Sequence, residues 1–228
     1  MNWKDIKRFF KKLFAPRKSK VKKLGWNDLT LLQYEELRLK TYNIPQEQYT
    51  NVAIEVLLGI KDPETSIPYT EYLQHVEELN FLTKAPQKNK LQEKYTLNGK
   101  VYTLDMNLQD FSVVQFQDFT TYTKQRPSSM IDMLSVVLVP EGAKYNDGSY
   151  DLEKAKEDIG SMSVCDGEAI INFFFLWFKR LLAAFQCSLD KYLRKMEKKG
   201  TLTEEQKKVL EIMKQKMTLM NLMVESMA

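Results

Sequence analysis

The 228-residue chain is 43% hydrophobic and includes 12 Phe, 11 Tyr and 3 Trp, which is enough to fill a real core and excludes a wholly disordered protein. Its net charge of +4 is divided unevenly along the sequence. Residues 1–24 contain ten Lys or Arg and a single acidic residue, Asp5, whereas the rest of the chain contains 24 basic and 29 acidic residues. A strongly basic arm therefore precedes a mildly acidic body, and such an arm favours phosphate, an anionic membrane or an acidic protein face.

The first predicted element is an amphipathic helix that ends at Pro16. Its apolar residues recur at helical spacing, and basic residues fill the positions between them. The predicted partner-binding arm consists of Trp3, Lys4, Ile6, Lys7, Arg8, Phe9, Phe10, Lys11, Lys12, Leu13 and Phe14. We expect a protein partner, because a helix laid in a groove uses this spacing, and contact with a membrane or with nucleic acid stays open. Residues 17–24 are predicted to be a charged, extended linker.

Two segments share one pattern of residues at an offset of 82 positions, DLTLLQYEEL at 28–37 and DFSVVQFQDF at 110–119. In each segment an N-cap residue, Thr30 or Ser112, precedes Gln33 or Gln115 by three positions, which is the spacing of a capping box. Two copies of one helical unit, over about 28–85 and 110–178, explain the match. Chance similarity between amphipathic helices is the alternative.

A β-hairpin is predicted between these two units. Lys94 to Leu97 and Lys100 to Asp105 flank Asn98-Gly99, a dipeptide suited to a tight turn in which both residues have positive φ. A turn-rich stretch then leads into a polar helix from about Asp151 to Ile159.

A long helix is predicted from about Ser163 to Lys199, with Gly200 just beyond its end. Its segment Ala169 to Phe178 is almost uniformly apolar but shorter than the roughly 20 residues of a membrane span, so we interpret it as a buried core helix. Cys165 and Cys187 lie about 33 Å apart along this helix and cannot form a disulfide with each other in it. A reducing compartment, a cytosol, is therefore expected.

A C-terminal helix is predicted to start at a further capping box, formed by Thr203 and Gln206. Its apolar residues are spaced alternately by three and four positions, as in a coiled coil, and most are Met, which makes adaptable contacts. This predicted partner-binding seam consists of Leu210, Met213, Met217, Met220, Val224 and Met227.

The predicted fold class is mainly α, with tandem helical units, one small β-hairpin and a long C-terminal αα-hairpin. We divide the chain into a basic arm and linker (1–24), a first helical unit (25–90), a β-hairpin with a second helical unit that ends in a long core helix (91–200), and a Met-rich interaction helix (201–228).

No residue pattern in the sequence points to catalysis or to a bound cofactor. His75 is the only histidine, no Gly-x-Ser-x-Gly motif accompanies it, and we interpret it as a structural residue. One His and two distant Cys do not supply the ligand pairs of a zinc site, and the scattered glycines form no phosphate-binding loop. We therefore expect no enzyme, no cofactor and no metal.

Three further groups of residues are interpreted as structural. Residues 146–151 are rich in oxygen ligands but lack the spacing of a calcium loop, so a surface turn is expected. The acidic pairs Glu35-Glu36 and Glu77-Glu78 are expected on solvated helix faces. The aromatic residues from Phe173 to Phe178 are expected to pack in the core.

A resemblance to a known family is carried by DFSVVQFQDFTTYTK (110–124), the apolar run ending in VPEG (139–142), KYNDGSYDLEKAKEDI (144–159) and SVCDGEAIINFFFLWF (163–178). These segments resemble tail-assembly-chaperone-like and virion structural proteins of tailed bacteriophages, especially crAss-like phages. The resemblance covers roughly residues 28–194, and its motifs are patterns of packing.

The resemblance implies a non-enzymatic, homo-oligomeric morphogenesis protein that acts in the host cytoplasm. Whether the protein stays in the virion is left open. Its expected partners are other tail, neck or portal-proximal proteins. A virion ring or connector and a tail assembly chaperone both fit. A peripheral membrane protein and a DNA-contacting virion protein, each acting through residues 1–24, are the alternatives.

Overall fold

The computed structural model describes residues 24–106, 111–125 and 127–199, together with positions 203, 208 and 211. The fold is mainly α, with a small antiparallel sheet and a long C-terminal helix, as the sequence predicted. The residues of the predicted arm and of the predicted C-terminal seam lie outside the described residues, and so does most of the second helix of the predicted C-terminal αα-hairpin.

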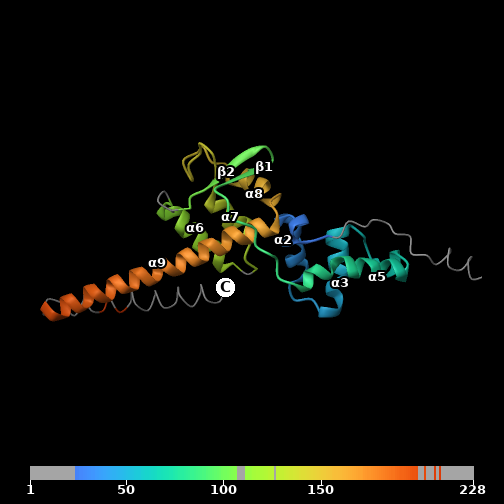
Figure 1. The fold of residues 1–228 in the computed structure, drawn as a ribbon, viewed down its shortest axis with the longest axis horizontal. Coiled ribbons are helices and arrows are strands. Elements are labelled where there is room, and N and C mark those ends of the chain that lie inside the picture. The colour runs from blue at the N-terminus through green and yellow to red at the C-terminus, as the bar shows by residue number, and fades with distance from the viewer. Residues whose placement is uncertain are drawn as a thin grey trace, which may run out of the picture.

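The first helical unit forms one end of the molecule (Figure 1). Its small core contains Leu37, Ala53, Ile54 and Leu79, and Leu24 packs against this cluster at the point where the described chain begins. Its elements are η1 (Trp26–Asp28), α2 (Leu31–Thr41), α3 (Gln46–Leu58), α4 (Pro63–Ser66), α5 (Tyr69–Glu78) and η2 (Leu79–Thr83).

The predicted hairpin is present and has a third strand. Strands β1 (Lys94–Leu97) and β2 (Lys100–Leu104) join at Asn98 and Gly99, whose φ angles are 47° and 79°, so both turn residues have the positive φ that the dipeptide predicted. Strand β3 (Leu138–Pro140) pairs antiparallel with β2. The sequence did not reveal β3, because it continues the apolar run of the preceding helix and only its pairing with β2 distinguishes it.

The second helical unit contains α6 (Val113–Lys124), α7 (Met130–Val137) and α8 (Leu152–Gly160). The capping boxes predicted at Thr30 and Ser112 are confirmed. The backbone amide of Gln33 donates to the Thr30 hydroxyl at 3.3 Å, and the backbone amide of Gln115 donates to the Ser112 hydroxyl at 3.2 Å.

The two matching helices have different surroundings. Leu31 in α2 is buried, whereas its counterpart Val113 in α6 is 73% exposed. Leu37 and its counterpart Phe119 are both buried. The similarity therefore covers how the helices start and one core position, and the duplication stays a prediction.

The long helix α9 (Val164–Lys199) begins beside α2. The Leu31 amide donates to the Met162 carbonyl at 2.8 Å, and the Val164 amide donates to the Leu29 carbonyl at 3.0 Å. These bonds flank an antiparallel bridge between Thr30 and Ser163, the residues that precede the two helices. The starts of α2 and α9 are thus fixed to each other, although they are far apart in the sequence.

The main core lies between the sheet, α7, α8 and the first half of α9. Its fully buried side chains include Tyr102, Leu134, Ile159, Ile170 and Phe174. The expected packing of the aromatic run is confirmed, because Phe174 and Phe178 are buried and their aromatic neighbours pack against them.

The apolar segment Ala169 to Phe178 packs in the core as expected, but the description of the long helix as a core helix is wrong for its second half. The helix is buried in the body as far as Phe178, and from Lys179 onward most of its described side chains are exposed. Figure 1 shows this second half leaving the body as a rod. By length and composition alone, α9 is also long and apolar enough to cross a membrane. In the protein, 25% of its most apolar stretch is buried.

A close approach between α2 and α9 generates the first testable prediction. A Cβ at Gly167 would lie 2.8 Å from Leu31 Cδ2, and Leu31 is fully buried and cannot move away easily. We expect Gly167→Ala to lower the free energy of unfolding by about 1–3 kcal/mol, because overpacking a dense core forces shifts in it. Urea unfolding measures this change.

Gly160→Ala is the matched control. A Cβ there would lie 3.5 Å from Leu32 Cβ, an ordinary van der Waals distance, so this substitution is expected to leave stability unchanged or to raise it slightly. Equal effects of the two substitutions would contradict a tight α2–α9 contact.

Candidate interaction surfaces

His75 lies on α5, and its two ring nitrogens face glutamates of the same helix. His75 Nδ1 is 2.9 Å from Glu78 Oε2, and His75 Nε2 is 3.9 Å from Glu71 Oε1. These contacts fit the interpretation of His75 as a structural residue. They also correct one prediction, because the Glu78 side chain is largely covered by the protein and does not lie on a solvated face.

Glu35 was also expected on a solvated face, and this expectation is wrong. Its carboxylate accepts hydrogen bonds from the Ser129 hydroxyl at 3.0 Å and from the Ile131 amide at 2.7 Å. Burial raises the pKa of Glu35 above its ordinary value, although these hydrogen bonds act in the opposite direction. Glu35 thus caps the start of α7 from α2, and only the fold reveals this partner 94 positions away.

A second polar cluster attaches the hairpin to α8. Asp158 is buried. It accepts hydrogen bonds from the Tyr102 hydroxyl at 2.7 Å and from the side-chain amide of Asn98 at 2.9 Å. Lys100 Nζ lies 3.2 Å from the same carboxylate. Desolvation by burial acts to raise the pKa of Asp158, but the three donors outweigh it and hold the pKa below its ordinary value of 3.8. The sequence gave no signal for this cluster, because its donors lie about 60 positions from Asp158.

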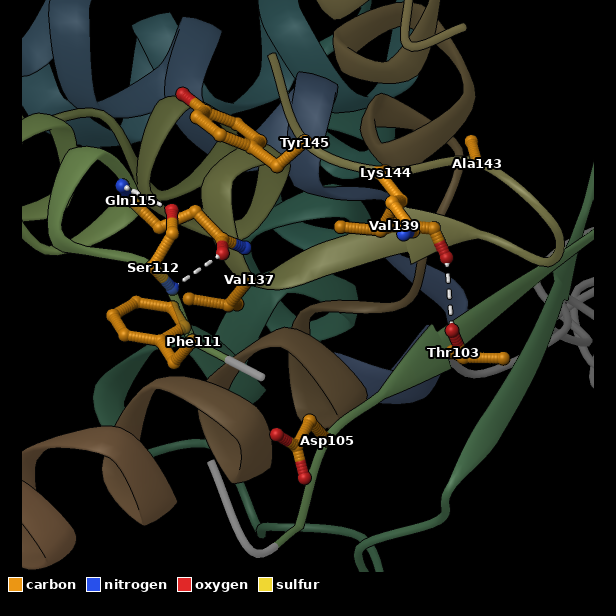
Figure 2. A pocket seen from close by; sticks show the side chains of 10 residues that line it. All are labelled: Thr103, Asp105, Phe111, Ser112, Gln115, Val137, Val139, Ala143, Lys144 and Tyr145. Atoms are coloured by element: carbon orange, nitrogen blue, oxygen red, sulfur yellow. Dashed lines mark hydrogen bonds between the residues drawn. The ribbon is translucent and has the colours of Figure 1, made fainter. Parts of the chain in front are cut away.

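A cavity of about 610 Å³ lies between α6, β3 and the loop that follows β3 (Figure 2). Figure 2 shows that its polar groups bond to one another. The Ser112 amide donates to Gln115 Oε1 at 2.9 Å, and the Thr103 hydroxyl donates to the Val139 carbonyl at 3.1 Å. The Tyr145 hydroxyl donates to Asp118. The last of these bonds holds the loop against α6, and the polar groups in these three pairs are already hydrogen-bonded.

A groove of about 410 Å³ separates α3 from α5 and η2. Apolar side chains from both sides form much of it, and Ala53 and Leu79 belong to the core of the first unit. The groove is lined by Gln46, Tyr49, Thr50, Ala53, Val76, Leu79, Asn80, Leu82 and Thr83. It is therefore an open extension of that small core.

An apolar stripe runs along α9 from the core into solvent. Successive spacings of four, three and eleven residues place its members on one face, because an α-helix has 3.6 residues per turn. Phe174 and Phe178 are buried, whereas Leu181 is 43% and Tyr192 is 51% exposed. The stripe consists of Phe174, Phe178, Leu181 and Tyr192. The face that packs in the core thus continues beyond the body as a surface.

The remaining expectations concern the turn at residues 146–151, the two cysteines and metal binding. Residues 146–151 form a surface turn, in which the Ser149 amide donates to Asp147 Oδ1 at 3.0 Å. Both cysteines are free, and they lie in α9 as predicted. Within the described part of the chain, no group of three or more His, Cys, Asp or Glu is arranged to hold a metal ion.

Comparison of the chain with protein-family models, with curated proteins and with solved structures found no match.

The Asp158 cluster makes stability depend on pH. A carboxyl whose pKa is lowered by folding stabilises the protein above the ordinary value of 3.8, and this contribution is lost as the pH falls through the lower native pKa. We expect Asp158→Asn to cost about 1.5–3 kcal/mol at pH 7, the usual range for hydrogen bonds to a charged group. The difference from the parent chain is expected to shrink below pH 3.8, as urea unfolding at a series of pH values measures.

Asp151→Asn changes another acidic residue associated with α8 and serves as a control for the general effect of charge. Its side chain accepts a hydrogen bond from the Lys154 backbone amide at the start of the helix. If Asp158→Asn lowered the free energy of unfolding equally at every pH, this would contradict a stabilising role for the charged form of Asp158.

Proposed function

We propose that the chain is a non-enzymatic, oligomeric assembly component that acts by binding other proteins. The exposed continuation of the α9 stripe is the observation that carries this proposal. Leu181 and Tyr192 expose large apolar area on a helix that projects from the body (Figure 1). Exposed apolar surface of this kind marks protein or membrane contacts, and an apolar helix face is a common form of protein interface.

The internal bonding of the polar clusters also supports a binding role. The carboxylates of Glu35 and Asp158 accept hydrogen bonds that join one structural element to another. A catalytic group needs a reacting atom within reach, whereas these groups are committed to holding helices and strands in place. The body is therefore suited to act as a rigid support for the projecting helix.

The biological setting of the proposal is the tail or neck of a tailed bacteriophage, as a virion ring or connector or as a tail assembly chaperone. This setting rests on the segments between residues 110 and 178 that resemble such proteins. The protein acts in the host cytoplasm during assembly, and its partners are other tail, neck or portal-proximal proteins.

Quantitative mass spectrometry of purified phage particles tests the setting. A stoichiometric amount of the chain in particles supports the ring or connector. Its absence from particles, together with binding to a tail or neck protein in extracts, supports the chaperone. Absence from particles with no such partner would contradict the phage setting.

Leu181→Glu tests whether the stripe is a binding surface. A carboxylate at this position must lose water when the stripe is covered, so we expect the dissociation constant for self-association or partner binding to rise at least about tenfold. Sedimentation velocity over a range of concentrations measures the change.

Ala183→Glu is the control, because it adds the same charge half a turn away, on the opposite face of α9. Both variants are expected to keep the parent urea midpoint, since these positions lie beyond the buried half of the helix. Equal binding by both variants and the parent chain would exclude the stripe as the contact.

A further inference from the structure

One face of the projecting half of α9 is covered. Leu189 and Met196 are half-buried, whereas Lys191 and Tyr192 between them are exposed. The spacing of seven residues places Leu189 and Met196 on the same face of the helix. Met196 lies about 27 Å along the helix axis beyond Phe178, which is buried in the body. Because α9 projects as a rod, the body is too far away to cover this face (Figure 1).

The part of the chain that follows α9 is long enough to cover it. The helix ends four residues before Thr203, which is not helical, and Lys208 and Glu211 are helical again and exposed. In helical spacing, the predicted seam from Leu210 to Met227 lies on the face opposite to Lys208 and Glu211. The seam spans about 26 Å at 1.5 Å per residue, and the projecting half of α9 spans about 30 Å.

The apolar residues of the two segments are arranged symmetrically about Thr203. Three apolar pairs lie at equal distances from it, seven, fourteen and twenty-one residues on either side. These pairs are Met196 with Leu210, Leu189 with Met217, and Leu182 with Val224. When two helices run antiparallel from a turn, residues equally far from the turn lie side by side. A turn at Thr203 therefore places Leu189 and Met196 against the seam.

We infer that the seam packs antiparallel against the face of α9 that contains Leu189 and Met196, within the same chain. At most eight residues separate the end of α9 from Lys208, and a short connection makes consecutive helices antiparallel neighbours. Such a tether also gives the seam an effective concentration in roughly the millimolar range at its own α9. The seam that the sequence analysis assigned to a partner is thus occupied by its own helix.

The hairpin leaves the apolar stripe of α9 open. Leu181 and Tyr192 lie on a face adjacent to that of Leu189 and Met196, and they are 43% and 51% exposed. The projecting rod therefore consists of two helices, of which α9 offers the stripe to a partner. This role of the stripe rests on the proposed function, whereas the hairpin itself does not.

Engineered disulfides in the full chain test the contact. The exposed Cys187 is first replaced by Ser, which leaves the buried Cys165 as the only native thiol. In this background we expect Leu189→Cys with Met217→Cys to form a disulfide within one chain on mild oxidation. The matched control is Lys191→Cys with Met217→Cys, since Lys191 is exposed on the other side of α9. The control is expected to oxidise at least about tenfold more slowly, because two cysteines on distant faces cannot be bridged.

Non-reducing electrophoresis and mass spectrometry of the linked peptides measure the rate and identify the linked positions. Equal rates for the two pairs would overturn the inference. Disulfides that join two chains, and that form more slowly on dilution, would also overturn it, because the seam would then bind a second copy.

Met217→Glu gives an independent test by hydrogen exchange of the full chain. A carboxylate has to lose water when the seam is covered, so this variant opposes the contact. We expect the backbone amides around Leu189 and Met196 to exchange at least about tenfold faster than in the parent chain. Lys208→Glu is the control, because it adds the same charge on an exposed face, and it is expected to exchange like the parent. Equal exchange in Met217→Glu and the parent would overturn the inference.

The chain with its hairpin locked by a disulfide separates this inference from the proposed function. Its seam stays occupied and its stripe stays open, so we expect it to bind proteins with the dissociation constant of the parent chain. Loss of binding on locking would identify the seam as the partner surface, which overturns the inference and leaves the assembly function standing. A hairpin that locks as expected, in a chain that neither self-associates nor binds any protein, would overturn the proposed function and support the hairpin.

Discussion

The fold depends on the contact that fixes the start of α2 to the start of α9. Two backbone hydrogen bonds around Thr30 and Ser163 align the helices, and Gly167 lets α9 approach the buried side chain of Leu31. Leu31 belongs to the main core, whereas Leu37, less than two turns later in α2, belongs to the core of the first unit. Both cores therefore share one helix, and loss of the α2–α9 contact is expected to weaken both.

This contact also determines what α9 presents to solvent. Its first half is held in the body by Phe174, Phe178 and their neighbours, so the direction of the second half is fixed as it leaves the body (Figure 1). The apolar stripe keeps its helical spacing across this boundary. One repeating pattern thus serves as core in the body and as exposed surface beyond it, and for this reason we assign a binding function to the helix.

Features that depend on nearby residues were predictable from the sequence. The two capping boxes, the Asn98-Gly99 turn and the extent of α9 follow from residues within one or two turns of each other. Strand β3 and the partners of Glu35 and Asp158 were not predictable, because each depends on a segment more than 30 positions away. The groove between α3 and α5 belongs to the same class, since its two sides meet only in the fold. Local patterns therefore located the helices, but the surfaces between them required the structure.

The central claim is that this protein acts by associating with proteins, including copies of itself, through surfaces outside its core. Native mass spectrometry of the unmodified full chain over a range of concentrations tests this claim most directly. We expect species at whole-number multiples of the 26.8 kDa chain that become more abundant with concentration. A single species of 26.8 kDa at every concentration, from a chain that also captures no protein from infected-cell extract, would contradict it.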